Sequence, residues 1–402
     1  MENRDDALPP RQASEESRQV RIAIIIEKMD ATRGGREKST AQIADHLASR
    51  GHDVTILCQI ARAGEDVKVI QMGKRGLTRR NKIAAFVSAV GDHIRREHYD
   101  VTHSMLPIPG ADVYQPRGGT IPGQIEGSCR RWGRAGWLRR RVFEPVNFHR
   151  NKLREYERVV ADDAHTLCLA VSQMVADEFA DHYGRTENVL VVPNGVDIPE
   201  LDDDQRANWR QHHRFRLGVG ADDPVFICVA TNFALKGVDP MIRAFAKWND
   251  LRHSDSNARL LVIGRESTEG YQRIAGLLGV GSKVIFLPPT DNVFEWYSAA
   301  DACVLLSHYD PCSRTVLEAV RWGVPSITTA HNGACELISD GAGVVVSNAQ
   351  DRWATVEAFE LLSDPKVRGR MSQRCDEISD QLSMDRHVDR LLEAYAGGVT
   401  AK

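Results

Sequence analysis

The 402-residue sequence lacks the features that mark secreted, disulfide-bonded and membrane-spanning proteins. Its eight cysteines lie far apart and form no Cys-x-x-Cys pair, which argues against a disulfide framework or a zinc site. No apolar run approaches the ~20 residues of a membrane span. The first nineteen residues are polar and charged, without the apolar core of a signal peptide. We therefore expect a cytoplasmic protein, with peripheral attachment to the inner face of the cytoplasmic membrane left open.

Charge and motif content exclude further classes of partner. A net charge of −3 gives no overall attraction to nucleic acid, and no nucleic-acid-binding motif is present. No cluster of His, Cys and acidic residues has the spacing of metal ligands. We therefore expect no nucleic-acid partner, no metal and no cofactor.

Strand and helix patterns alternate through the first half of the chain. Residues 21–26 form a β-branched run typical of a strand buried on both faces. A glycine-containing loop, a helix at about 38–50 and a strand from residue 54 follow. Such βαβ units build parallel sheets. Further strands are expected at 101–104, 167–171 and 189–192, and Ser172 can cap a helix that runs to about residue 183.

A polar stretch at 197–223 separates this half from a second alternating series. We predict an α/β fold in which two doubly wound, Rossmann-like domains, at 21–196 and 197–380, face each other across a cleft. A disordered leader at 1–20 and a C-terminal helix at 381–402, crossing back to the first domain, complete the chain. Ligands of such folds bind at the carboxyl ends of the strands. The strands of the second series are expected at 225–230, 260–263, 284–287, 302–306, 326–329 and 344–346, with helices at 240–248, 293–300 and 314–322.

Two loops have residues suited to phosphate binding. Gly34 and Gly35 follow the first strand, where backbone N–H groups can approach a phosphate, although a tight turn would also explain them. A dinucleotide site is disfavoured, because the loop lacks Gly-x-Gly-x-x-Gly and the second strand ends in Cys58-Gln59 rather than in an acid. Lys236, after the strand at 225–230, can hold a diphosphate or can be a solvated lysine.

The most informative segment is residues 309–318, which connects the strand at 302–306 to the next helix. Ser313 is a plausible N-cap, and the free N–H groups of the first turn would point into the cleft. Glu318 could reach the hydroxyl groups of a ribose, or could simply complement the helix dipole. The spacing alone leaves these two interpretations open.

Residues 33–40 (RGGREKST), 192–197 (VPNGVD), 232–237 (NFALKG) and 309–319 (YDPCSRTVLEA) resemble, in matching order, landmarks of the family 4 glycosyltransferases. The last segment corresponds to that family's Glu-x7-Glu signature, with Asp310 and Glu318 in the acidic places. Residues 109–114, a basic insertion and Tyr156-Glu157 are similar to the lipopolysaccharide core glucosyltransferase I subgroup. The resemblance implies a GT-B fold with an N-terminal acceptor side and a C-terminal nucleotide-sugar side.

The resemblance also implies an activity and a set of site residues. The chain would be a retaining hexosyltransferase that uses a nucleotide-diphosphate sugar and a glycan or glycolipid acceptor, in lipopolysaccharide or cell-envelope polysaccharide synthesis. Catalytic roles would fall on Lys236, Asp310, Glu318 and His103, the last as an acceptor contact. The donor site would comprise Gly34, Gly35, Asn232, Lys236, Gly264, Asp310, Cys312, Ser313, Arg314, Thr315, Val316 and Glu318.

Two departures from the family pattern leave alternatives open. Asp310 is one methylene shorter than the usual Glu, and the arginine often found before Lys236 is absent. The chain could therefore be a non-catalytic protein that binds sugar nucleotides or glycans. It could also be a GT-B sugar-nucleotide epimerase, which would need no acceptor.

The basic insertion at 129–154 predicts a second binding surface. It contains eight arginines and one lysine against the single acid Glu144, with aromatic residues set among them. Basic and aromatic residues together favour docking on an anionic membrane. The same residues could instead form a solvated loop or bind an anionic soluble acceptor. The expected membrane contacts are Arg130, Arg131, Trp132, Trp137, Arg139, Arg140 and Arg141.

Overall fold

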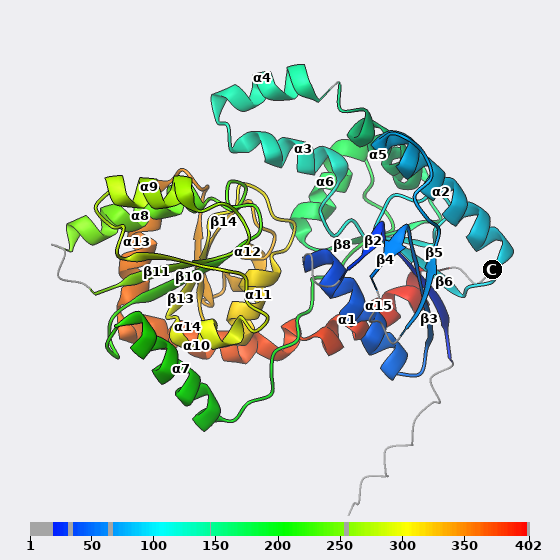
Figure 1. Ribbon diagram of the computed structural model, residues 1–402. Helices are drawn as coiled ribbons and strands as arrows, with labels where there is room; N and C mark the ends of the chain where they lie inside the picture. The colour runs from blue at the N-terminus through cyan, green and yellow to red at the C-terminus, as the bar shows by residue number, and fades with distance from the viewer. Residues whose placement is uncertain (1–18, 31–34, 63–66, 145, 253–256, 400–402) are drawn as a thin grey trace, which may run out of the picture.

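The computed structural model describes residues 19–30, 35–62, 67–144, 146–252 and 257–399. Two lobes lie side by side in Figure 1, each built around a sheet with helices on both faces. The elements of the first lobe are β1 (Arg21–Ile25), β2 (Lys28–Met29), α1 (Gly35–Ser49), β3 (Asp53–Cys58), β4 (Ile60–Ala61), β5 (Lys68–Gln71), α2 (Arg79–Arg96), β6 (Val101–Ser104), β7 (Val113–Tyr114), α3 (Ile121–Arg130), α4 (Arg134–Phe143), α5 (Phe148–Asp162), β8 (Leu167–Ala170), α6 (Gln173–Tyr183) and β9 (Val189–Val191).

The second half of the chain begins after residue 196, forms the second lobe and ends with helices that return to the first lobe. Its elements are α7 (Asp203–Leu217), β10 (Val225–Val229), α8 (Val238–Leu251), β11 (Arg259–Ile263), α9 (Glu269–Leu277), β12 (Val284–Leu287), α10 (Phe294–Ala299), β13 (Ala302–Leu305), α11 (Arg314–Arg321), β14 (Ser326–Thr329), α12 (Cys335–Ile338), β15 (Gly343–Val346), α13 (Arg352–Ser363), α14 (Pro365–Ser379), the 3-10 helix η1 (Asp380–Leu382) and α15 (Met384–Gly398).

Both main sheets are parallel, which confirms the predicted α/β fold. The first has the order β5-β3-β1-β6-β7-β8-β9 and the second the order β12-β11-β10-β13-β14-β15. β2 and β4 form a separate pair. In β1, Ile22 and Ile24 pack into one core while Ala23 and Ile25 pack into another. The strand is therefore buried on both faces, as its unbroken apolar run predicts.

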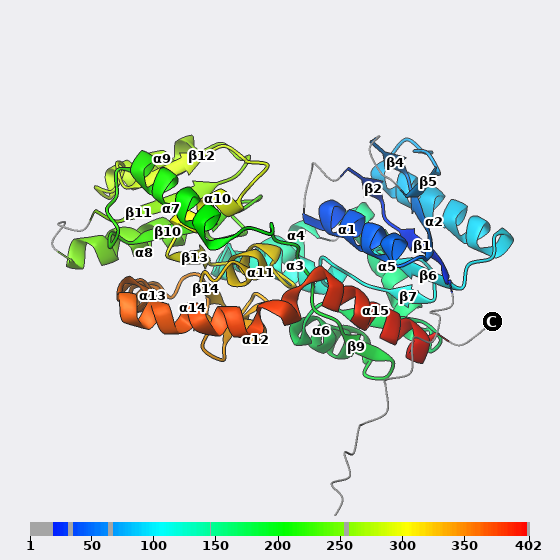
Figure 2. The ribbon, with the colours of Figure 1, turned by 90° about the horizontal axis from the view of Figure 1, so that it is seen from below.

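The chain crosses between the lobes twice. The first crossing follows β9, and the second runs along α14 and η1 into α15, which lies against α1 (Figure 2). Met384, Val388 and Leu391 of α15 belong to the same apolar core as the residues of β1. The two crossings touch where the N–H of Val196 donates to the carbonyl of Leu382 at 3.0 Å. The C-terminal helix is thus part of the first lobe.

Helix α7 occupies the polar stretch that we expected to be a separator between the lobes. Asp202 caps it in a capping box with Gln205. Its inner face is cationic and aromatic rather than aliphatic: Arg214 donates to Asp301 at 3.1 Å, and Trp209 stacks on Trp322 at 6.2 Å. Apolar periodicity, the main sequence signal for a helix, is therefore weak here.

Candidate functional site

A lysine and an aspartate meet where two adjacent strands end. β10 and β13 are neighbours in the second sheet, so the loops that follow them lie together. Lys236 from the first loop forms an ion pair with Asp310 from the second, and both side chains are largely buried. Gly237, at φ +69°, allows this approach, because a Cβ there would overlap the carbonyl of Leu306. Two predicted catalytic residues are therefore brought into direct contact.

The N-terminus of α11 lies beside this pair. Ser313 is the N-cap and accepts from the N–H of Val316 at 3.5 Å, which confirms the predicted cap. Asn332 accepts from the N–H of Ser313 at 3.2 Å, and Thr315 donates to the carbonyl of Val229 at 3.1 Å. These bonds fix the helix start against the end of β10. Such a helix end can bind an anion.

The first lobe approaches the same helix start. Gly35 opens α1, and a Cβ there would stand 3.6 Å from the Arg314 side chain. Arg314 donates to Gln42 at 2.8 Å and to the carbonyl of Gly195 at 3.1 Å, so its guanidinium bridges the lobes. Glu318 lies 3.6 Å from the same guanidinium, with 14% of its side chain exposed. Gly34, the other predicted loop glycine, lies outside the described residues.

Three residues of the predicted donor set shape the loops. Asn232 adopts a φ of +103° and accepts from the N–H of Leu235 at 3.1 Å, which forms the turn before Lys236. Gly264 lies against the carbonyl of Ala230, where a Cβ would not fit. Cys312 is buried, and its carbonyl accepts from Asn194 at 2.8 Å.

His103 occupies a different environment from the one expected for an acceptor contact. It is fully buried in β6, and its Nδ1 lies 2.7 Å from the hydroxyl of Tyr395 in α15. Burial, with a smaller effect of Arg117, lowers the pKa of His103 to about 3. A neutral imidazole packed beneath the C-terminal helix offers no exposed face to an acceptor.

Arg117 lies close to Arg314 and Cys312 of the site, and the sequence did not single it out. Its side chain is buried and donates to Ser39, to Asn194 at 2.6 Å and to Gln115 at 3.1 Å. Within the described part of the chain, no carboxylate lies at ion-pair distance from it. Burial and the nearby charge of Arg314 lower the pKa of Arg117 to about 9. The only sequence signal was its place before the two glycines at 118–119.

Tyr309 inserts its ring into the first lobe. Its hydroxyl donates to Glu178 at 3.1 Å, and its ring fills the space where a Cβ of Gly119 or Gly127 would be. Behind it, burial raises the pKa of Glu157 to about 7, although this carboxyl accepts bonds from two tyrosines and a backbone N–H. The loop that carries Asp310 is therefore anchored in both lobes.

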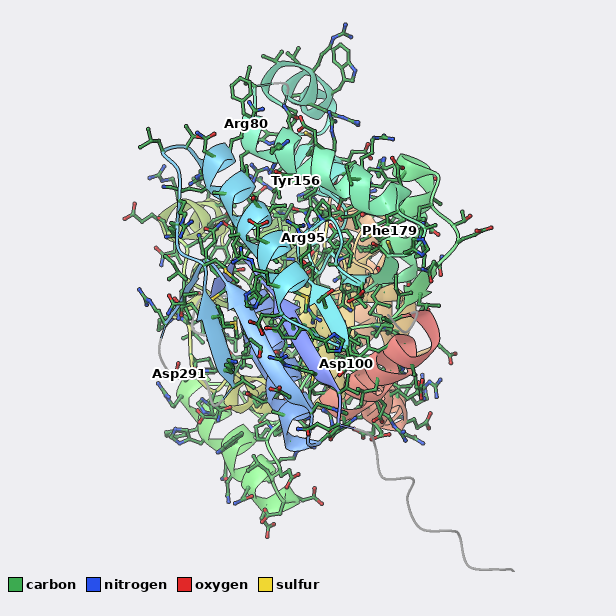
Figure 3. The ribbon with its side chains drawn as sticks, turned by 90° about the vertical axis from the view of Figure 1, so that its right-hand side faces the viewer. Arg80, Arg95, Asp100, Tyr156, Phe179 and Asp291 are labelled. Carbon is green, nitrogen blue, oxygen red and sulfur yellow. The ribbon has the colours of Figure 1, made fainter. Side chains whose placement is uncertain are left out.

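The basic insertion at 129–154 forms the end of α3, all of α4 and the first half of α5, with the turns between them. α4 projects above the two lobes in Figure 1 and stands clear of the body in Figure 3. Trp137 and Leu138 are 65% and 55% exposed, and Arg140 pairs with Glu126 at 2.9 Å. Arg131 and Trp132 instead line a cavity between the lobes. The side chain of Arg139 lies outside those that the structure describes.

No helix among the described residues is both long and apolar enough to span a bilayer.

The structure has two facing Rossmann-like lobes. Lys236, the acids Asp310 and Glu318 and the N-terminus of α11 lie between them, and this arrangement defines a protein of the GT-B class. The profile of the family described as "Glycosyltransferase Family 4" matches residues 33–200, and that described as "Glycosyl transferases group 1" matches residues 210–377. Together they cover most of the chain. The protein belongs to the family 4 glycosyltransferases, as the sequence motifs predicted.

Individual relatives support this placement. Lipopolysaccharide glucosyltransferase WaaG of Escherichia coli is 26% identical, over 91% of this chain and 96% of that protein. D-inositol 3-phosphate glycosyltransferase of Acidothermus cellulolyticus is 27% identical, over 90% and 85%. The crystal structure of WaaG, a glycosyltransferase involved in lipopolysaccharide biosynthesis, superposes with a TM-score of 0.77 at 22% identity, covering 94% of this chain and all of that one. The Anabaena Alr3699/HepE complex with UDP-glucose has a TM-score of 0.68 at 17% identity, covering 94% of this chain and all of that one.

Proposed function

We propose that the chain is a retaining hexosyltransferase. It would move a hexose from a nucleotide-diphosphate sugar to a glycan or glycolipid acceptor, in lipopolysaccharide or cell-envelope polysaccharide synthesis at the inner face of the cytoplasmic membrane. The observation that carries this proposal is the contact of Lys236 with Asp310 beside the start of α11. Two relatives are named for sugar transfer, and one structural neighbour was solved in complex with UDP-glucose.

The chemistry follows from where charge develops. As the bond between the sugar and the diphosphate breaks, positive charge grows on the sugar and negative charge on the leaving group. Lys236 and the N–H groups at the start of α11 stabilise the leaving diphosphate, a task that a metal performs in other enzymes. Asp310 contacts the transferred sugar and Glu318 the ribose hydroxyls. The acceptor hydroxyl attacks from the face that the diphosphate leaves, which retains the anomeric configuration.

A donor panel tests this function. We expect one nucleotide sugar to raise the melting temperature, since a ligand at 100 times its Kd stabilises the folded state by about 2.7 kcal/mol. The same donor should be consumed faster when acceptor is added, and EDTA should leave the rate unchanged. Binding without turnover would favour a non-catalytic role, and conversion of the donor without acceptor would favour an epimerase. Loss of activity in EDTA, restored by Mg²⁺ or Mn²⁺, would contradict the metal-independent mechanism.

A further inference from the structure

A cavity of about 440 Å³ lies between the lobes, next to the proposed donor site. Arg131 and Trp132, after α3, form its wall from the first lobe, and residues of α8, α9 and α13 form its wall from the second. Ala234 and His308 also line it, two residues before Lys236 and Asp310 respectively. The N–H of His308 donates to the carbonyl of Leu235 at 2.9 Å, so the cavity and the donor loops share one backbone framework.

The charge in this cavity is unbalanced. The side chain of Arg131 has no hydrogen-bond or ion-pair partner among the described residues, and its Nε atom is buried and unpaired. Arg352, exposed at the start of α13, has no such side-chain partner there either. The single acid of the lining, Asp239, is already paired with Arg243 at 3.1 Å. Nearby Glu266 accepts from the N–H of Phe233 at 2.9 Å.

The neighbouring His308 is affected by the positive charge of this cavity. Burial lowers the pKa of His308 to about 4, and the charges of His331 and Arg131 act in the same direction. His308 is therefore neutral at pH 7, and the cavity's uncompensated positive charge comes from Arg131 and Arg352. Neither of these two arginines is paired with a carboxylate of the protein, so both can interact with an anion that enters the cavity. Unpaired arginines of this kind favour binding of a phosphate or carboxylate.

Two aromatic side chains complete the lining. Trp132 is 48% exposed and stands beside the Arg131 guanidinium, 5.3 Å from ring to cation. Tyr271 of α9 packs edge-on against Phe233 at 5.5 Å. Aromatic faces next to cationic groups suit a ligand that has both an apolar surface and a negative charge, as a charged sugar does. The volume lies within the range of small-molecule sites, ≈ 300–1,000 Å³.

We propose that this cavity is an acceptor subsite that binds a negatively charged sugar, through Arg131 and Arg352 and the faces of Trp132 and Tyr271. The proposal rests on the proposed transfer function, because it places the charged sugar beside the donor loops. It adds that the acceptor carries a phosphate or carboxylate near the hydroxyl that receives the hexose.

The test uses small probes on the full chain, with the donor site filled by the nucleoside diphosphate that stabilises the protein most. Glucose 6-phosphate, glucuronate, glucose and inorganic phosphate are titrated by saturation-transfer NMR. We expect glucose 6-phosphate or glucuronate to bind about tenfold more tightly than glucose, and more tightly than phosphate alone. Which of the two charged sugars binds better distinguishes a phosphate from a carboxylate.

Arg131→Gln with Arg352→Gln should remove the preference for charged sugars, while stabilisation by the nucleotide sugar stays intact. The matched control is Arg95→Gln with Arg96→Gln, which removes two arginines at the end of α2, outside the cavity, and should keep the preference. Equal binding of glucose and glucose 6-phosphate, or equal losses in both double variants, would overturn the proposal. Phosphate binding as tightly as the charged sugars would also overturn it. Loss of nucleotide-sugar stabilisation in the cavity variant would assign the cavity to the donor instead.

Discussion

At the scale of single residues, Lys236 and Asp310 form an ion pair, and we propose that this pair faces the diphosphate of the donor. Replacing Lys236 with Ala, or Glu318 with Ala, should lower the transfer rate by about 10²–10³-fold, the usual cost of one preorganised charge contact. Both side chains are mostly buried but keep a solvent-exposed edge, so we expect each variant to remain folded, with a lower melting temperature in Lys236→Ala, where Asp310 loses its partner. Initial rates and thermal melts measure the two effects. Lys247→Ala, at an exposed ion pair of α8, is the control. Near-normal rates in either site variant would show that the donor site is misplaced.

We propose that Arg314 and Arg117 supply the positive charge of the arginine that the family often has before Lys236. Arg314 donates to neutral partners and lies 3.6 Å from Glu318, and Arg117 has no acid at ion-pair distance within the described residues. We expect Arg314→Gln to weaken binding of the nucleoside diphosphate about tenfold, and binding of the monophosphate less. Calorimetry of both nucleotides measures this difference. Arg314→Lys should recover part of the affinity, and an equal loss for both nucleotides would contradict a diphosphate contact.

At the scale of elements, the strands and the site loops could be predicted from sequence, and the contacts between lobes could not. The buried run of β1 and the cap at Ser313 have strong local signals, and both are present. Lys236 and Asp310 could be placed because both follow strands of one sheet. Helix α7 was missed, because Arg214 and Trp209 form its buried face. The burial of His103 depends on α15, whose position no local pattern near β6 indicates.

Helix α4 is the element that would attach the protein to a membrane. Its exposed Trp137 and Leu138 can enter the interface, and each arginine near an anionic surface contributes roughly 1 kcal/mol. Replacing Arg139, Arg140 and Arg141 with Ser should therefore weaken binding to anionic vesicles about 10²-fold. Co-sedimentation at low and high salt measures the effect, since screening weakens it.

The control for the α4 variant is Arg95→Ser with Arg96→Ser. These residues end α2, and Figure 3 shows Arg95 well away from α4. This variant should bind as the unaltered protein does. Equal binding to neutral and anionic vesicles, or no binding to either, would contradict the membrane role and would favour a solvated helix or a grip on a soluble anion.

At the scale of the whole molecule, the two lobes are joined by contacts that converge on the loop carrying Asp310. Glu336 of α12 accepts from the N–H groups of Gln173 and Met174, at 2.9 and 3.0 Å, and so neutralises the start of α6 in the other lobe. Asn194 and Arg314 add bonds across the same boundary. The lobes of this structure therefore meet through specific polar contacts at the edge of the proposed site.

Tyr309 packs closely against glycines of the first lobe at this boundary. Gly119, Gly123 and Gly127 are spaced four residues apart, and each lacks room for a Cβ. Gly123 faces the carboxylate of Glu178, and the other two face the Tyr309 ring. Residues at this spacing lie on one face of α3 and of the turn that precedes it. Because all three are glycines, the helix can come within contact distance of the second lobe. The spacing of the glycines is visible in the sequence, but the residues that pack against them are not.

Gly127→Ala tests whether this close approach matters for transfer. Alanine should stabilise a free helix position by up to about 1 kcal/mol, but here its Cβ would overlap Tyr309, and overpacking costs about 1–3 kcal/mol. We expect a lower melting temperature, and a transfer rate reduced by about tenfold if about 1.4 kcal/mol of this strain is passed to the transition state through Asp310, which directly follows the displaced tyrosine. Gly369→Ala, at an exposed position of α14 with open space around it, should be neutral or stabilising.

A double-mutant cycle with Tyr309→Gly identifies the cause, because a Cβ at Gly127 would meet both the Cβ and the ring of Tyr309. Tyr309→Gly alone removes the bond to Glu178 and leaves a void beside Gly119 and Gly127, so it should be destabilising. If the tyrosine side chain is what the new methyl group meets, adding Gly127→Ala to this variant should cost nothing further, because the clash is removed and alanine favours the helix more than glycine does. Denaturant unfolding of the four proteins measures the interaction energy. Additive losses, or a Gly127→Ala protein as stable as Gly369→Ala, would mean that Tyr309 does not hold the lobes together.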